Sequence, residues 1–297
     1  MTGPGSWAQQ VRRAAKLIAD ADSLVIAAGA GMGVDSGLPD FRGESGFWET
    51  YPALGARGMS FTEIASPAAF RVDPLTAWGF YGHRLGLYRR VTPHDGFRIL
   101  LRWANRMPLG ARVYTSNVDG QFQAAGFRDD AVYECHGSIH HLQCLDPCHD
   151  GVWPAAEFIP IVANAGCELL SDLPRCIRCG TLARPHVLMF DDRGWIDGLS
   201  EKRKCFDRWL ESTSHPVVVE IGAGTALPSV RHFTRNVIRN HGGSVVRINP
   251  RDWAVPEGDD VGLAAGALDG LREIDSCLSG RQPRSVDGNC STTTITP

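Results

Sequence analysis

The chain has 297 residues, of which 43% are hydrophobic, so it can bury a sizeable core as one large domain or two smaller ones. Its net charge of -3 gives no electrostatic reason to expect nucleic acid or an anionic membrane as a partner. No signal-peptide core and no stretch of the roughly 20 apolar residues that span a bilayer are present, which favours a cytoplasmic protein. Its nine cysteines are too sparse for a disulfide scaffold, so we expect reduced or metal-bound thiols.

Strand and helix patterns alternate along the chain. Ser6 and Gln9 have the spacing of a capping box ahead of a helical stripe, and residues 23–28 form a β-prone run that ends in glycines. Further patterns predict, in order, a helix over 97–104, a strand over 111–117, a strand and glycine loop over 216–224, a helix over 230–238 and a strand over 244–249. This alternation predicts a doubly wound α/β domain with a parallel sheet.

Ligands of such a sheet bind at the carboxyl ends of its strands, where three loops here are rich in glycine and polar residues: 29–43, 115–120 and 222–230. Two stretches interrupt the alternation. Residues 44–91 are rich in aromatics and helical in their second half, and residues 138–184 hold most of the cysteines. The polar segment 279–297 is predicted to be disordered.

The loop "GAGMGVDSGLPDFRG" (29–43) fails the dehydrogenase fingerprint G-x-G-x-x-G. Val34 occupies the third glycine position, and Pro39 interrupts the segment where a helix should continue. The glycines still allow backbone amides to approach a phosphate, so nucleotide binding stays open while hydride transfer loses support. A tight turn after a strand accounts for most glycine clusters, so this loop alone is weak evidence for nucleotide binding.

Together with other segments, however, this loop resembles the sirtuin (Sir2-like) family of NAD-dependent protein deacylases. The family pattern is matched in order by "GAGMGVDSGLPDFRG", "TSNVDG", "CHGSIHHLQC", "CIRCGTLARPHVLMF", "GAGTALPSV" and "RINP". The resemblance implies a Rossmann-like NAD-binding domain (8–43, 92–137 and 185–278), a helical insertion (44–91) and a small zinc-binding domain (138–184). It also implies that NAD and an acyl-lysine protein meet in the cleft between them. The oligomeric state stays open.

The resemblance also implies roles for single residues. His136 would be the general base on the ribose, a task that suits the pKa of histidine, although most histidines picked blindly are merely packed or solvated. Asn117 would contact the ribose and its water, and Asp119 the nicotinamide, where "NVDG" alone would suggest an Asx turn. The residues expected to bind the cofactor are Gly29, Ala30, Gly31, Asp40, Phe41, Arg42, Ser116, Gly224, Thr225 and Asn249.

Two cysteine pairs have the spacing of zinc knuckles. Cys144 and Cys148 form one pair, and Cys176 and Cys179 form the other. Four thiolates leave zinc no open coordination position, so the metal is expected to fold the small domain and to take no part in catalysis. Nearby histidines, at 140, 141 and 149, complicate the ligand assignment.

The chain departs from the family pattern at several positions. Gly33 replaces a serine, Ser116 a glutamine and Phe122 a histidine, while "FDD" replaces F-G-E. The reaction rate or the cofactor geometry could therefore differ from those of the family, but an active enzyme remains the favoured hypothesis. The alternatives are an NAD glycohydrolase or ADP-ribosyltransferase, and a non-catalytic NAD-binding module.

The helical insertion indicates which acyl group is removed. Trp78, Tyr81, Leu85 and Tyr88 form an apolar helical stripe, which on its own makes Tyr81 a core aromatic and Arg84 a side chain that covers apolar surface. However, "FYGHR" matches the F-Y-x-x-R pattern of class III sirtuins, in which the tyrosine and arginine recognise the carboxylate of succinyl-type lysine. The expected substrate-binding residues are Tyr81, Arg84, Val187, Leu188 and Phe190.

Overall fold

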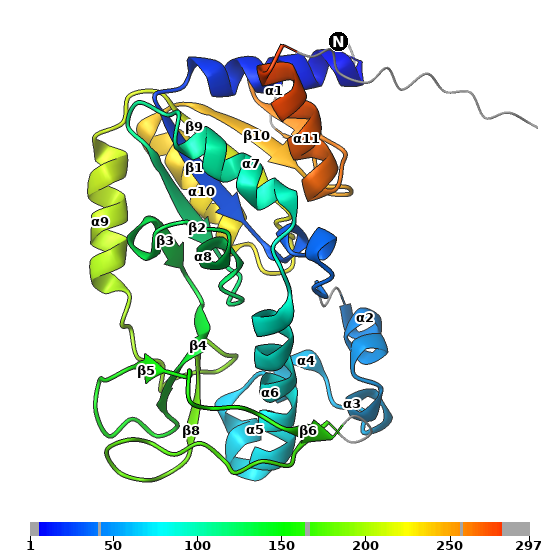
Figure 1. The fold of residues 1–297 in the computed structure, drawn as a ribbon, viewed down its shortest axis with the longest axis vertical. Helices are drawn as coiled ribbons and strands as arrows, with labels where there is room; N and C mark the ends of the chain where they lie inside the picture. Colours follow the sequence, from blue (N-terminus) through cyan, green and yellow to red (C-terminus); the bar gives the residue numbers. More distant parts are fainter. Residues whose placement is uncertain (1–5, 41–42, 164–166, 256–257, 281–297) are drawn as a thin grey trace, which may run out of the picture.

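The computed structural model describes residues 6–40, 43–163, 167–255 and 258–280. It contains two lobes: a parallel sheet with helices on both faces, and a smaller lobe below it (Figure 1). Apart from its first two residues, the segment predicted to be disordered lies outside the described residues. No helix in the described part of the chain is long and apolar enough to cross a membrane.

The main sheet has six parallel strands in the order β11-β10-β9-β1-β2-β3. Their bounds are β1 (Ser23–Ala28), β2 (Ala111–Thr115), β3 (Val132–Glu134), β9 (Pro216–Ile221), β10 (Ser244–Ile248) and β11 (Val261–Leu263). From β1 the chain runs outward through β2 and β3, then returns to the other side of β1 and runs outward again from β9. The strand order therefore reverses between β1 and β9, where ligands of doubly wound sheets bind, and the predicted fold class is confirmed.

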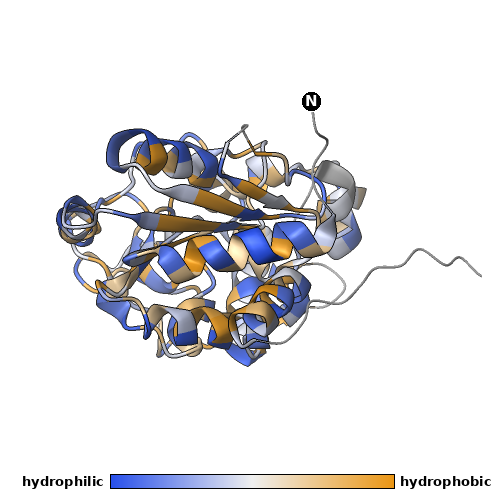
Figure 2. Ribbon diagram, turned by 90° about the horizontal axis from the view of Figure 1, so that it is seen from above, coloured by the Kyte–Doolittle hydropathy of each residue, from blue (hydrophilic) through white to orange (hydrophobic). Residues whose placement is uncertain are grey.

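Two helical layers cover this sheet. One contains α1 (Trp7–Asp20), α7 (Asp95–Ala104) and α11 (Ala267–Leu278), and the other contains α9 (Ser200–Glu211) and α10 (Ser229–His241). Alternate residues of β1 pack into different layers, Leu24 and Ile26 on one side and Val25 and Ala27 on the other, which explains why this strand reads as a continuous apolar run. Figure 2 shows these apolar strands between helices that carry both hydrophilic and hydrophobic residues.

Short elements complete this lobe: α8 (Gln121–Ala124) and the 3₁₀ turns η1 (Ala30–Met32), η2 (Val34–Ser36) and η3 (Asp129–Ala131). The capping box of α1 is present as predicted, because the Ser6 side chain accepts from the Gln9 amide while the Gln9 side chain accepts from the Ser6 amide.

The second lobe is built from the two stretches that interrupt the alternation of strands and helices, residues 44–91 and 138–184. Its helices are α2 (Gly43–Thr50), α3 (Pro52–Ala56), α4 (Phe61–Ile64), α5 (Pro67–Val72) and α6 (Pro74–Arg90). Its strands are β4 (Gly137–Cys144), β5 (Trp153–Pro154), β6 (Val162–Ala163), β7 (Glu168–Leu169) and β8 (Ala183–Val187). The strand β4 pairs with β5 and β8, and β6 pairs with β7.

Helix α6 is the centre of the second lobe. The predicted stripe is buried, but so are residues on the other sides of the helix, including Phe80 and Arg84. The buried surface of α6 is therefore wider than the predicted stripe. Gly79 makes this enclosure possible, because a Cβ at that position would overlap the carbonyl oxygen of Cys167 just before β7. Gly86, on the same helix, would meet only the flexible end of Arg90.

Gly79→Ala is therefore expected to lower the free energy of unfolding by about 1–3 kcal/mol, because the backbone before β7 must move to admit the methyl group. Gly86→Ala is the matched control and should raise it by up to about 1 kcal/mol through helix propensity. Urea denaturation of the three proteins measures both. Equal effects of the two substitutions would contradict the close packing of α6 on this segment.

Candidate functional site

A cavity of about 800 Å³ opens where the sheet order reverses, between the carboxyl ends of β1, β2 and β9 and the second lobe. All three predicted ligand loops contribute to its wall. The predicted site residues that line it are Gly29, Ala30, Asp40, Tyr81, Arg84, Ser116, Asn117, Asp119, His136, Val187, Leu188, Phe190, Gly224 and Thr225.

Two predicted cofactor residues lie behind this wall. Gly31 packs on the backbone of Gly222, to whose carbonyl oxygen its amide donates at 3.1 Å. Asn249 is buried and donates to the carbonyl oxygen of Ala223 at 2.9 Å, while its own side-chain oxygen accepts from the amide of Asp252. Ala223 and Asp252 line the cavity, so Asn249 shapes the wall indirectly. Phe41 and Arg42 lie outside the described residues.

The loop after β2 presents Asn117 and Asp119. The side-chain amide of Asn117 donates to the carbonyl oxygen of Gly29 at 3.0 Å, which ties the ends of β1 and β2 together. Asp119 is buried, and burial raises the pKa of its carboxyl to about 6, although the Gln121 amide and the charge of Arg84 oppose the shift. Burial therefore favours the protonated form of this carboxyl more than in an exposed aspartate.

His136 follows β3 at the junction of the two lobes. Its Nε2 lies 3.2 Å from the Ser229 hydroxyl oxygen, at the start of α10. Burial lowers the pKa of the imidazole, and a hydrogen bond to the backbone of Ser116 only partly offsets this, so burial favours the neutral form of the ring. Sequence reasoning missed Ser229, which is 93 residues away in the chain.

Tyr81 and Arg84 lie together on the α6 side of the cavity, as the sequence predicts. Arg84 is only 7% exposed, and its guanidinium carbon lies 5.2 Å from the ring centroid of Phe80 and 5.5 Å from those of Tyr81 and Tyr88. Its Nε also donates to the Tyr88 hydroxyl at 3.0 Å. A buried, oriented cation therefore borders the cavity.

The chain that leaves β8 forms another part of the cavity wall. The amide of Leu188 donates to the carbonyl oxygen of His136 at 2.9 Å, and the amide of Phe190 donates to that of Ala65 at 3.0 Å. Met189 lines the cavity in the same segment, although we did not predict it. Residues 187–190 therefore run from the backbone of His136 towards the end of α4.

Two of the residues that depart from the family pattern, Phe122 and Asp192, lie outside the cavity wall. Phe122 does not line the cavity but packs in the core, with its ring centroid 4.9 Å from that of Phe97. Asp192, in "FDD", forms a fully buried ion pair with Arg184 at 2.8 Å. Neither of these two departures removes a polar group from the cavity wall.

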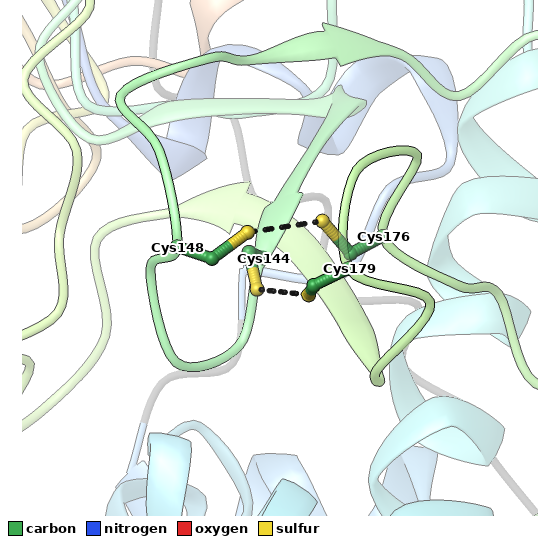
Figure 3. Close-up of side chains that lie close together, drawn as sticks. All are labelled: Cys144, Cys148, Cys176 and Cys179. Atoms are coloured by element: carbon green, nitrogen blue, oxygen red, sulfur yellow. Dashed lines mark hydrogen bonds between the residues drawn. The ribbon is translucent and has the colours of Figure 1, made fainter.

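The four predicted cysteines converge at the far end of β4 (Figure 3). Their sulfur atoms all lie within 4.8 Å of one another, and the Cys144–Cys179 and Cys148–Cys176 sulfur distances are both 3.7 Å. Zinc bound to sulfur at about 2.3 Å in a tetrahedron would separate neighbouring sulfur atoms by about 3.8 Å. The cluster therefore fits a structural zinc site. The nearby His149 Nε2 lies 3.5 Å from the sulfur of Cys176.

Comparisons with known proteins agree with this geometry. A model of the Sir2 family matches residues 29–224. An NAD-dependent protein deacylase of Thermococcus kodakarensis is 31% identical over 263 residues, which cover 88% of this chain and 93% of that protein. One from Aquifex aeolicus is 27% identical over 252 residues, which cover 85% and 93%. The crystal structure of a Sir2 homologue–NAD complex superposes with a TM-score of 0.67 at 24% identity, covering 90% of this chain and 93% of that one, and shows the fold.

The cysteine cluster predicts one zinc ion per chain in the purified protein. Cys176→Ala should lose both the metal and the folded second lobe, because thiolate–zinc bonds supply folding free energy that this lobe's short strands do not. Zinc content by mass spectrometry and the circular dichroism spectrum measure the two losses. Cys205→Ala, at an exposed position of α9, is the matched control and should keep both. A Cys176 variant with full zinc and native spectrum would contradict the assignment.

Proposed function

The chain belongs to the Sir2 family and is an NAD-dependent protein deacylase, and on that premise we propose that it prefers lysines carrying a dicarboxylic acyl group, with His136 as general base. Succinyl-, malonyl- and glutaryl-lysine are the substrates in question. The observation that carries this preference is the burial of Tyr81 and Arg84 side by side on the cavity wall.

The cavity suits NAD at the end nearest the sheet. Glycine backbone from the loops after β1 and β9 lines it, together with the polar groups of Asn117, Asp119 and Thr225. NAD supplies a nicotinamide–ribose bond whose cleavage makes the ribose an acyl acceptor. Asn117 would orient the ribose from its fixed position on Gly29, and Asp119 would contact the nicotinamide.

His136 would take a proton from a ribose hydroxyl. A general base must be unprotonated, and burial lowers the pKa of this imidazole, so the ring is available at neutral pH. The Ser229 hydroxyl at Nε2 would help to orient the ring. The acyl-lysine backbone would lie along residues 187–190, next to the carbonyl oxygen of His136.

Arg84 would bind the distal carboxylate of the acyl chain. A guanidinium pairs with a carboxylate through two parallel hydrogen bonds, and acetyl-lysine has no group to meet it. The three surrounding aromatic rings and the bond to Tyr88 hold this cation in a fixed orientation, which lowers the entropy lost on binding.

His136→Ala should lower kcat by roughly 10²–10⁴-fold, the usual contribution of a general base, while NAD binding is largely kept. Release of nicotinamide in the presence of an acyl-lysine peptide measures turnover. His141→Ala, at an exposed histidine of β4, is the matched control and should turn over like wild type. Wild-type turnover of the His136 variant would exclude it as the base.

The acyl preference predicts a higher kcat/KM for succinyl-lysine than for acetyl-lysine peptide. Arg84→Met keeps an apolar body on α6 and should lower desuccinylation by roughly 30-fold or more, because the substrate carboxylate loses its buried partner. Tyr81→Phe removes only the hydroxyl and should act in the same direction. Deacetylation should change little in both variants. A wild-type preference for acetyl-lysine, or an equal loss of both reactions, would show that Arg84 is structural.

A further inference from the structure

The cavity-lining loop 29–40, called the cofactor loop below, has little regular structure of its own. Apart from two three-residue 3₁₀ turns it is irregular, and it contains four glycines. It nevertheless presents Gly29, Ala30, Leu38, Pro39 and Asp40 to the cavity. Side chains that do not line the cavity connect this loop to helices α7 and α11.

His94, immediately before α7, makes the first connection. Its backbone amide donates to the Ser36 hydroxyl at 3.0 Å, and its Nε2 lies 2.8 Å from the carbonyl oxygen of Met32. Its Nδ1 accepts from the Gly96 amide at 3.0 Å and so caps α7. Because a carbonyl oxygen can only accept, Nε2 carries the hydrogen. A single neutral imidazole thus joins the helix start to the cofactor loop, and it is 9% exposed.

Asp35 makes the second connection. Its Oδ2 accepts from the amide of Leu268 at 2.8 Å, in the first turn of α11. That helix begins after Gly266, which has no side chain to cap it. A loop residue 233 positions away therefore supplies both the missing acceptor and a negative charge at the helix N-terminus.

We propose that His94 and Asp35 are positioning residues that hold the cofactor loop in its NAD-binding conformation from outside the cavity. A loop that is already ordered loses less conformational entropy when ligand binds, so the two connections should favour NAD binding rather than the chemical step. The inference rests on the proposed contact between this loop and NAD.

His94→Asn separates the two functions of the imidazole. Asparagine is a good helix N-cap and can still accept from the Gly96 amide, but its side chain is too short to reach Met32 as well. The variant should raise both the dissociation constant and KM for NAD by roughly three- to tenfold, as for one lost hydrogen bond, with kcat and the peptide KM within about twofold of wild type.

Asp35 offers a second, independent variant pair. Asp35→Ala removes the acceptor for Leu268 and should raise KM for NAD by about threefold, because the bond is solvent-exposed. Asp35→Asn keeps an acceptor oxygen and should restore most of the affinity. Ser6→Ala removes the cap of α1, a helix that contributes no residue to the cavity lining, and is the control for general loss of stability, with wild-type KM for NAD.

Three possible results would each contradict a different part of this proposal. If Asp40→Ala, at a loop residue that lines the cavity, leaves NAD affinity unchanged, the proposed contact of the loop with NAD is wrong. If Asp40→Ala weakens NAD binding but His94→Asn and Asp35→Ala do not, the positioning role is wrong. If the His94 and Asp35 variants lower kcat, peptide affinity and thermal stability together with NAD affinity, these residues are merely structural.

Discussion

The close approach of the backbone after β1 to the backbone after β9 is the constraint on which the site depends. A Cβ at Gly29 would lie 2.8 Å from the carbonyl oxygen of Gly222, and a Cβ at Gly31 would lie 2.7 Å from its Cα. Only glycine admits this contact, which brings two strand ends together where the strand order reverses. The amide of Gly29 also donates to Ile221, and that of Gly222 to Ile248, so β1, β9 and β10 are locked in one arrangement behind the cavity.

Strand β4 connects the cavity to the second lobe. His136 precedes its first residue, and Cys144, a predicted zinc ligand, is its last. Its partner β8 pairs Val187 with Gly137 at one end and Ala183 with Cys144 at the other. The cysteine cluster and the histidine thus lie at opposite ends of one strand pair, so a metal held by the four cysteines would fix where the segment 187–190 begins without reaching the cavity.

The sequence predicts those parts of the structure that rest on local patterns. The capping box of α1, the apolar run of β1 and the cysteine spacing each need only a few neighbouring residues. Helix α9 was missed because only Phe206 and Leu210 on it are buried, and β11 because a three-residue strand carries no periodicity. The hydrogen bonds of His136 with Ser229 and of His94 with Met32 join residues far apart in the chain, which no local pattern can reveal.

The stretch "FDD", which stands where the family pattern has F-G-E, fixes the turn after the cavity wall through its last residue. Asp192 pairs with the buried Arg184 of β8 and accepts from the amides of Met189 and Gly194 through its two oxygens. One carboxylate therefore closes the turn that follows the cavity-lining segment 187–190. Because a buried charge without its partner is costly, the pair also keeps this turn from opening, and the wall that faces His136 stays in place.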